Sequence, residues 1–315
     1  VCDKFGVAGS SVHGVSRLFS WWFPRFDRSR YDVRLIGLRG EDDASETLRR
    51  QGVMVRCLGK RKFDGSTVVA LVSAIRRMRA DVVHLHGYGA ANFGRPAARL
   101  TGIKAIVHEH FVDPAIPRYQ VGVDRALSRW TDRGIAVSHS VKAFMARRRG
   151  IPEERIAVIF NGAPLSDFQP PDGSGASAQR HRWGVLEGHQ VVASIGRLDE
   201  QKGHRYFLEA AASLVRKGYP LTVLLVGDGP LQGALQAQSR GLGIERHVVF
   251  TGYQTDIAAI QSIVDVQVFA SLWEGTPLTV FEAMAMGRPI VSTWVDGLGV
   301  VLREGENALL VAPRN

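Results

Sequence analysis

Two glutamates, Glu274 and Glu282, lie within residues 269–287, whose pattern predicts the end of a strand, a polar loop and a short helix. Thr276 is expected to cap that helix, and Pro277 to be its first residue, because proline needs no N–H partner there. Gly287 follows the helix at a position where a left-handed residue commonly ends one. The unpaired N–H groups and the dipole of a helix start together make it an anion-binding site.

The two carboxylates lie before and after this expected anion site. Glu274 precedes the helix, and Glu282 comes about five residues into it, roughly 7 to 8 Å beyond the first turn at about 1.5 Å per residue. This is about the reach from a diphosphate to the ribose of the same nucleotide. The pattern therefore predicts a ligand with a sugar near Glu274, phosphates at the helix start and ribose beside Glu282, which is the outline of a nucleotide sugar.

Two cations, Arg197 and Lys202, follow an expected strand at 191–195. Arg197 offers a planar fork of donors and Lys202 a point charge, so together they can neutralise a diphosphate. The alternative interpretation is two solvated loop charges, which contribute little. Gly227 and Gly229 form a turn after the expected strand at 221–226, and this turn is too short to be the Gly-x-Gly-x-x-Gly dinucleotide pattern.

Two His-x-His pairs end two further expected strands: His84 with His86, and His108 with His110. Each pair points to one side of its strand, because side chains alternate along a strand. One interpretation is a metal site, which this spacing permits. We expect no metal, because no Asp-x-Asp and no further His, Cys or Asp cluster completes such a site. The other interpretation is that His84 and His108 are buried and hydrogen-bonded.

The segment that starts with Glu274-Gly275-Thr276-Pro277-Leu278 and continues through Phe281-Glu282 resembles the Glu-x7-Glu motif of retaining family 4 glycosyltransferases. The loop with Arg197 and Lys202 resembles the Gly-Arg-Leu…Lys-Gly loop of that family. The resemblance covers nearly the whole chain and is strongest from 191 to 313. It implies an α/β chain with the GT-B fold, in which two Rossmann-like, doubly wound parallel-sheet domains face each other across a cleft.

The resemblance also implies an activity, namely transfer of a hexose-type sugar from a nucleoside diphosphate sugar to a glycan or lipid-linked acceptor, with retention at the anomeric carbon. Glu282 would hold the ribose, and Glu274 would bind sugar hydroxyls. His110 would hydrogen-bond the sugar or stabilise developing charge, and would not be a nucleophile. In the family, the leaving phosphate takes the acceptor proton, so no protein nucleophile is required. Neutralisation of the diphosphate by Arg197 and Lys202, together with the missing Asp-x-Asp, predicts catalysis without a metal or another cofactor. The remaining donor-binding positions would be Arg197, Lys202, Gly227, Gly229, Gly275, Thr276, Pro277 and Leu278.

The acceptor side is less clearly marked in the sequence. Gly9 and Ser10 belong to an expected glycine-rich turn, which in the family approaches the donor phosphates and the acceptor. A tight strand-to-helix turn explains Gly9 equally well. By the same resemblance, His86 would border the acceptor pocket.

The order of elements predicts two domains. Strands and helices alternate in both halves, which favours parallel doubly wound sheets. We expect an acceptor-binding domain at 1–168, a linker at 169–185 and a donor-binding domain at 186–315. The chain starts within its first expected strand and stops before helices that full-length relatives contain. It therefore reads as a truncated form, and this leaves its domain closure and activity open.

Composition limits the class of protein and its location. The chain has 315 residues with 45% apolar residues, a mean hydropathy of −0.03 and a net charge of +10. No apolar run of 18 residues and no signal-peptide pattern occur, and Cys2 and Cys57 have no metal or redox spacing. These features predict a soluble cytoplasmic protein.

The net positive charge of the chain lies in the first domain. Residues 1–168 hold 28 Lys and Arg against 16 Asp and Glu, a net of +12, whereas residues 169–315 hold 12 against 14, a net of −2. A basic domain favours an anionic partner. We expect peripheral contact with the inner face of the cell membrane, and no nucleic acid, because no basic–aromatic recognition module is present. The aromatic run at 18–26 predicts a half-buried helix; a segment in the membrane interface is the alternative.

Two other functions fit the sequence less well. One is a GT-B-fold nucleotide-sugar epimerase or phosphorylase, although no lysine context for pyridoxal phosphate is evident. The other is a non-catalytic module that binds a nucleotide sugar or an anionic surface, and the basic first domain supports it.

Overall fold

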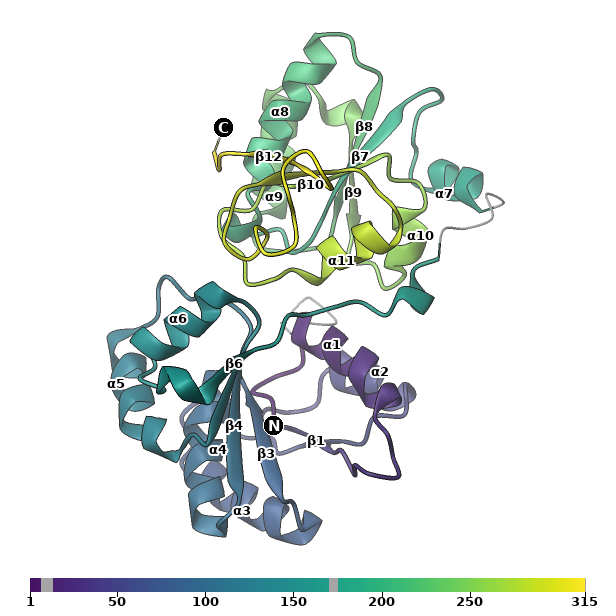
Figure 1. The fold of residues 1–315 in the computed structure, drawn as a ribbon. Helices are drawn as coiled ribbons and strands as arrows, with labels where there is room; N and C mark the ends of the chain where they lie inside the picture. Colours follow the sequence, from purple (N-terminus) through teal and green to yellow (C-terminus); the bar gives the residue numbers. More distant parts are fainter. Residues whose placement is uncertain (7–13, 170–174, 315) are drawn as a thin grey trace. The chain divides into compact units, whose positions relative to one another are not determined.

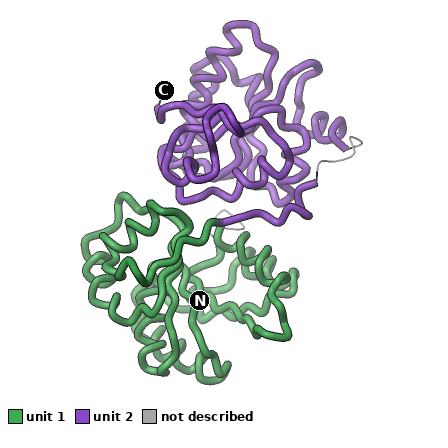
Figure 2. The backbone as a smooth tube through the Cα atoms, in the orientation of Figure 1, with its two compact units in different colours: residues 1–160 green, residues 161–315 purple. Residues whose placement is uncertain are grey.

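The computed structural model describes residues 1–6, 14–169 and 175–314. The chain divides into two compact units, Val1–Phe160 and Asn161–Asn315, which we call unit 1 and unit 2 (Figure 2). Both units alternate strands with helices, as Figure 1 shows along the colour gradient. The prediction of an α/β chain with two Rossmann-like parallel-sheet domains is confirmed.

Unit 1 is built around parallel strands. Its strands are β1 (Leu35–Gly37), β2 (Val55–Cys57), β3 (Val82–His86), β4 (Lys104–Glu109), β5 (Arg133–Ala136) and β6 (Ile156–Val158). Its helices are α1 (Gly14–Trp22), α2 (Asp43–Arg50), α3 (Ser66–Met78), α4 (Tyr88–Thr101), α5 (Arg118–Leu127) and α6 (His139–Arg147). The strands β3-β4-β5-β6 and the pair β1-β2 run parallel, and Cys2 links the two groups by bridges to Gly37 and His86.

Unit 2 contains one parallel sheet in the order β12-β11-β10-β7-β8-β9. Its strands are β7 (Gln190–Ile195), β8 (Leu221–Val226), β9 (Val248–Gly252), β10 (Val266–Phe269), β11 (Ile290–Thr293) and β12 (Leu309–Val311). Its helices are α7 (Ala176–Arg182), α8 (His204–Arg216), α9 (Gln232–Gly241), α10 (Ile257–Gln261) and α11 (Leu278–Ala285). The strand order reverses between β7 and β10, and ligands of such sheets bind at the carboxyl ends of the strands beside this switch point.

Helices cover both faces of the unit 2 sheet (Figure 1). Alternate residues of β8 face opposite sides, as strand geometry requires. Val223 and Leu225 pack with α8 and α9, whereas Leu224 and Val226 pack with α10. All four side chains are fully buried, which explains why this strand reads as a continuous apolar run in the sequence.

The aromatic run near the start belongs to the core of unit 1. Leu18, Phe19 and Phe23 are buried, so the prediction of a helix packed on its own sheet is confirmed. Among the described residues, no helix combines the length and the apolar character needed to cross a bilayer.

Some boundaries in the structure differ from the expected ones. Part of the segment predicted as a linker is the helix α7, and Trp183, which follows it, packs against the unit 2 core. The contact-based division of the chain falls after Phe160, earlier than the predicted boundary at 168.

Candidate functional site

The predicted donor-binding residues of unit 2 follow the two strands beside the switch point. The loop 196–203 leaves the carboxyl end of β7, and the loop 270–277 leaves that of β10. The two strands are hydrogen-bonded neighbours in the sheet, so their loops emerge side by side at one edge. This is the edge at which open parallel sheets bind ligands.

Lys202 and Glu274 meet between these loops. The Lys202 Nζ atom donates to Glu274 Oε1 at 2.6 Å, and the side chains are only 18% and 4% exposed. The same carboxylate accepts hydrogen bonds from Ser271 Oγ at 2.7 Å and from Gln201 Nε2 at 3.2 Å. A carboxylate with a cation and two neutral donors is held in one orientation, because hydrogen bonds that involve charge are strong.

Backbone contacts bring the two loops together. The Leu272 N–H donates to the Gln201 carbonyl at 2.8 Å. Gly203 has a φ of +61°, and a Cβ added there would lie 2.0 Å from the carbonyl oxygen of Ala270. Only glycine tolerates both the left-handed conformation and so close an approach. Gly203 therefore sets the spacing that lets Lys202 reach Glu274.

Arg197 lies at the start of the same loop and is 48% exposed. Its Nε atom donates to Asp199 Oδ2 at 2.6 Å. Asp199 also accepts from the Lys202 N–H at 3.3 Å, so one carboxylate fixes the turn that carries both cations. Arg197 remains accessible enough to contact a ligand.

Gly227 and Gly229 pack under the loop that carries Arg197. A Cβ at Gly227 would lie 2.1 Å from the Gly196 oxygen, and one at Gly229 would lie 2.4 Å from the Leu198 oxygen. The Leu198 N–H donates to the Asp228 carbonyl at 2.7 Å. These contacts explain why both positions require glycine, whether or not a ligand binds nearby.

Helix α11 begins one residue later than expected. Its first residue is Leu278 and Pro277 precedes it, so Thr276 lies too early to be its cap and that prediction is wrong. The predicted end is confirmed, since Gly287 has a φ of +63° just beyond the helix. Gly275 and Thr276 are buried in the loop before the helix, and Asn161 Nδ2 donates to the Thr276 carbonyl at 3.1 Å.

Glu282 is the fifth residue of α11, as the sequence predicts, but it has no exposed surface. A ribose could reach this carboxylate only after neighbouring side chains move. The role of Glu282 in ribose binding stays a prediction.

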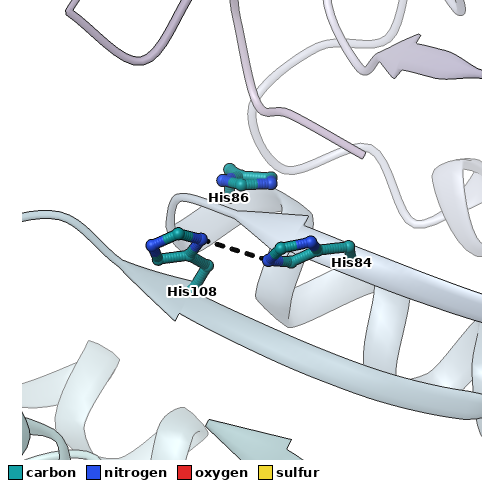
Figure 3. Close-up of side chains that lie close together, drawn as sticks. All are labelled: His84, His86 and His108. Carbon is teal, nitrogen blue, oxygen red and sulfur yellow. Dashed lines mark hydrogen bonds between the residues drawn. The ribbon is translucent and has the colours of Figure 1, made fainter. Parts of the chain in front are cut away.

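In unit 1 the two His-x-His pairs form a single group of four imidazoles at the carboxyl ends of β3 and β4. The strands are parallel neighbours, with His86 in register with His108. His84 Nε2 and His108 Nδ1 are 3.1 Å apart, as the dashed line in Figure 3 marks. His86 Nδ1 and His110 Nε2 are 2.9 Å apart. We call these residues the histidine cluster; the sequence indicated two separate pairs, and their convergence was not predicted.

The histidine cluster is neutral at physiological pH. Burial lowers the pKa of His84 to about 4 and that of His110 to about 3. Burial also lowers the pKa values of His86 and His108 well below the usual range, and neighbouring histidines lower them further. Among the described residues, the His110 Nδ1 atom is buried and has no hydrogen-bond partner. The prediction that His108 is hydrogen-bonded holds for its Nδ1 atom but not for Nε2, which has no partner there either.

A buried ion network lies directly after β4. Arg149 is completely buried; it pairs with Glu109 and donates to Asp124 Oδ1 at 3.0 Å. Asp124 also accepts from Arg95 at 2.6 Å, and Glu109 Oε1 accepts from the His110 N–H at 3.2 Å. Burial raises the pKa of Glu109, and the charge of Arg149 opposes that shift. The network thus anchors the backbone at His110, and no motif in the sequence indicated it.

The structure brings some predicted residues together and leaves others apart. Lys202 and Glu274 are bonded to each other, and His86 contacts His110. His110 belongs to unit 1 and Glu274 to unit 2. Gly9 and Ser10 lie outside the described residues, so their predicted role stays a prediction.

Two family profiles match this chain. The profile described as "Glycosyltransferase Family 4" matches residues 13–167, and the profile described as "Glycosyl transferases group 1" matches residues 189–315. Together they cover unit 1 and unit 2 apart from the first residues and the segment 168–188. Arg197, Lys202 and Glu274 all lie within the second match.

The chain is also similar to characterised enzymes. The UDP-Gal:alpha-D-GlcNAc-diphosphoundecaprenol alpha-1,3-galactosyltransferase of Escherichia coli is 26% identical over 95% of this chain and 81% of its own length. The 2-deoxystreptamine glucosyltransferase of Streptomyces kanamyceticus is 30% identical over 76% of this chain and 66% of its own length. The chain spans only 61 to 66% of the length of several relatives.

A solved structure has the same architecture. Anabaena Alr3699/HepE in complex with UDP-glucose aligns with a TM-score of 0.84 over 100% of this chain and 85% of its own, at 22% identity. The likeness extends through both parallel-sheet units. Two family matches that together span both units, and a shared architecture, show that this chain belongs to the family 4, group 1 glycosyltransferases of the GT-B fold.

Proposed function

We propose that this chain is a retaining hexosyltransferase that moves a sugar from a UDP-sugar to a glycan or lipid-linked acceptor, with no metal at the donor site. The observation that carries the proposal is the bonded pair of Lys202 and Glu274, which lies at the switch point of unit 2 beside the start of α11. A cation suits the diphosphate of a nucleotide sugar, and a carboxylate beside it suits the sugar hydroxyls.

The names of the relatives support the choice of donor and acceptor. The E. coli enzyme is named for UDP-Gal as its donor and for a sugar on diphosphoundecaprenol as its acceptor. The HepE structure was solved with UDP-glucose. We therefore assign UDP to the donor of this chain, and a lipid-linked glycan to its acceptor.

Donor binding changes the partners of the two side chains. The Lys202 ammonium and the half-exposed Arg197 guanidinium turn toward the diphosphate, where the N–H groups at the start of α11 add positive potential. Glu274 then accepts hydrogen bonds from sugar hydroxyls, while Ser271 and Gln201 keep it oriented. These cations bear the charge that a metal ion bears in other transferases.

In the transfer step, the acceptor oxygen forms a bond to the anomeric carbon as the bond from that carbon to the β-phosphate oxygen breaks. The leaving diphosphate takes the acceptor proton on the same face, so the configuration is retained. Charge that develops on the diphosphate is stabilised by Lys202 and Arg197. His110 is neutral, and its role toward the sugar stays a prediction, because its Nδ1 atom is buried and the ring has to move before this atom can meet a sugar hydroxyl.

An enzyme with a lipid-linked acceptor encounters that acceptor at the membrane surface. All of the net positive charge lies in unit 1, because the rest of the chain is slightly negative, and a basic surface is attracted to anionic headgroups. We therefore propose peripheral association of unit 1 with the inner face of the cell membrane, in the cytoplasm.

A transfer assay tests the proposal. The chain is incubated with radiolabelled UDP-glucose or UDP-galactose and with GlcNAc-diphosphoundecaprenol, and labelled lipid is separated from free donor. We expect labelled product with one of these donors, and at least a ~100-fold loss of rate for Glu274→Ala. The matched control is Glu306→Ala, which removes an exposed glutamate of the same unit that pairs only with the nearby Arg303 among the described contacts.

The outcomes separate the alternatives. Product formed equally well by Glu274→Ala would show that this carboxylate has no part in the site. UDP binding without transfer to any lipid-linked or glycan acceptor would favour a non-catalytic nucleotide-sugar module. Release of free epimerised sugar would favour an epimerase.

A further inference from the structure

We propose that His84, His86 and His108 form a binding site for one divalent transition-metal ion, of the kind exemplified by Zn²⁺, in unit 1. All three ligands belong to unit 1, whereas Lys202 and Glu274, to which we assign no metal, belong to unit 2. Figure 3 shows the three imidazoles gathered at the ends of β3 and β4.

The spacing of the ligand atoms suits a metal ion. One ring nitrogen from each of the three residues lies within 4.8 Å of the others. With Zn–N bonds of about 2.0 to 2.1 Å, two ligands of a tetrahedral ion are about 3.3 Å apart. His84 Nε2 and His108 Nδ1 are already 3.1 Å apart. The third nitrogen, on His86, lies within 4.8 Å of these two, so this ring has to turn toward them for all three to bind one ion.

Hydrogen bonds within the histidine cluster do not satisfy it. The two N···N contacts, between His84 and His108 and between His86 and His110, use one nitrogen of each ring. His108 is only 4% exposed, and among the described residues its buried Nε2 atom has no hydrogen-bond partner. An unsatisfied buried polar atom costs about 1 to 3 kcal/mol, and a metal ion on His108 Nδ1 would not remove this cost. The closeness of the three ring nitrogens therefore carries the proposal.

The chemistry of the ligand atoms also limits the kind of metal. A histidine binds a metal ion through an unprotonated ring nitrogen. Neutral imidazoles select Zn²⁺, Cu²⁺ or Ni²⁺ over Mg²⁺ and Ca²⁺, which require oxygen ligands.

The surroundings hold the rings in place. Trp22 stacks on His108 with a centroid distance of 5.9 Å, and Phe19 meets the His86 ring edge-on at 4.9 Å. His110 contacts His86 at 2.9 Å and can orient it as an outer partner. Three neutral histidines leave a fourth position open on a tetrahedral ion, which is the arrangement of a site that can exchange a ligand.

Calorimetric titration of the full chain, without an affinity tag, with Zn²⁺ alone tests the proposal. We expect one ion per chain, and Co²⁺ in its place should give the visible absorption of a tetrahedral site. His84→Asn and His108→Asn should each raise the Kd for Zn²⁺ by at least about tenfold. The far-ultraviolet circular dichroism of each variant shows whether it is folded.

The matched control is His247→Asn. His247 stacks on His189 in unit 2 at 5.6 Å, so it tests whether any pair of adjacent histidines accounts for the binding. We expect no change in this variant, and none in Glu274→Ala. The proposal is overturned if the folded chain binds no Zn²⁺, or if both cluster variants bind it as tightly as the parent chain. It is equally overturned if the His247 variant accounts for the loss.

Discussion

The ion pair between Lys202 and Glu274 joins two loops of unit 2 and is nearly buried. Glu274 and Lys202 were predicted to bind different parts of one ligand. The structure shows that they bind each other, across 72 positions of the chain. The motif indicated each residue type, but a pairing at this range depends on the sheet order, which places β10 next to β7. Ser271 and Gln201 were missed because neither residue type stands out in a loop.

The ion pair between Lys202 and Glu274 leads to a prediction about the free energy of unfolding. Lys202→Met should lower the free energy of unfolding by about 2 to 4 kcal/mol, because it leaves a buried carboxylate without its cation. Adding Glu274→Gln should restore most of the loss, since an amide can still bond to Ser271. Urea unfolding of the two single variants and the double variant measures this coupling. Lys217→Met, an exposed lysine after α8, is the control. A double variant less stable than Lys202→Met would contradict the account.

His204 makes a prediction for pH dependence. It is buried, and burial lowers its pKa to about 4. As the pH falls below the unfolded pKa of about 6.5, the His204 imidazole becomes protonated in the unfolded chain but stays neutral in the folded chain. Its stability contribution is therefore complete above pH 6.5 and is lost toward pH 4, by at most about 3 kcal/mol.

The measurement is thermal unfolding between pH 7 and pH 5. His204→Gln should lose less stability over this range than the parent chain does, whereas the exposed His181→Gln should follow the parent. Equal slopes for all three proteins would show that His204 titrates normally in the folded chain.

At the level of elements, the contact between the loops after β7 and β10 depends on Gly203. Gly203→Ala should cost about 2 to 4 kcal/mol, because it adds both a left-handed alanine and a clash with the Ala270 carbonyl. The same change at Gly233, inside α9 with open space around it, should stabilise by up to about 1 kcal/mol. Thermal melts of both variants compare them directly. If Gly203→Ala melts at the parental temperature, the loops do not require this close approach.

The sequence predicted most elements but not all of their details. The strand β8 matches the predicted 221–226, because a run of buried apolar residues is a clear signal. The cap of α11 was misplaced by one residue, since Thr276 and Pro277 are both reasonable before a helix start. Helix α7 was missed because it follows a run of Pro, Gly and Ser that favours a loop.

The histidine cluster could have been predicted at this scale. Consecutive strands of a parallel sheet are commonly neighbours, so pairs that end β3 and β4 fall at one edge. Taken singly, neither pair completes a metal site, and for that reason no metal was predicted. The ion network beside it, which joins Glu109, Arg149 and Asp124, gave no comparable signal because its members are far apart along the chain.

At the scale of the whole molecule, the chain consists of two parallel-sheet units with different charge. Unit 2 contains the predicted donor residues, and the family match to it begins at residue 189, close to the predicted start at 186. The basic residues are concentrated in the first half, where the acceptor is expected. The resemblance predicted the fold of both units, because their strand–helix alternation is regular. It could not predict the limits of the units within a few residues, since these depend on packing.

The most direct test of the central claim is a calorimetric titration of the chain with UDP in the presence of EDTA. We predict one UDP per chain, because Lys202, Arg197 and the start of α11 together supply the positive charge that the diphosphate needs. The folded double variant Lys202→Met with Glu274→Gln should bind UDP at least about tenfold more weakly. Binding of equal strength in that variant, or no binding of UDP to the parent chain, would contradict the account.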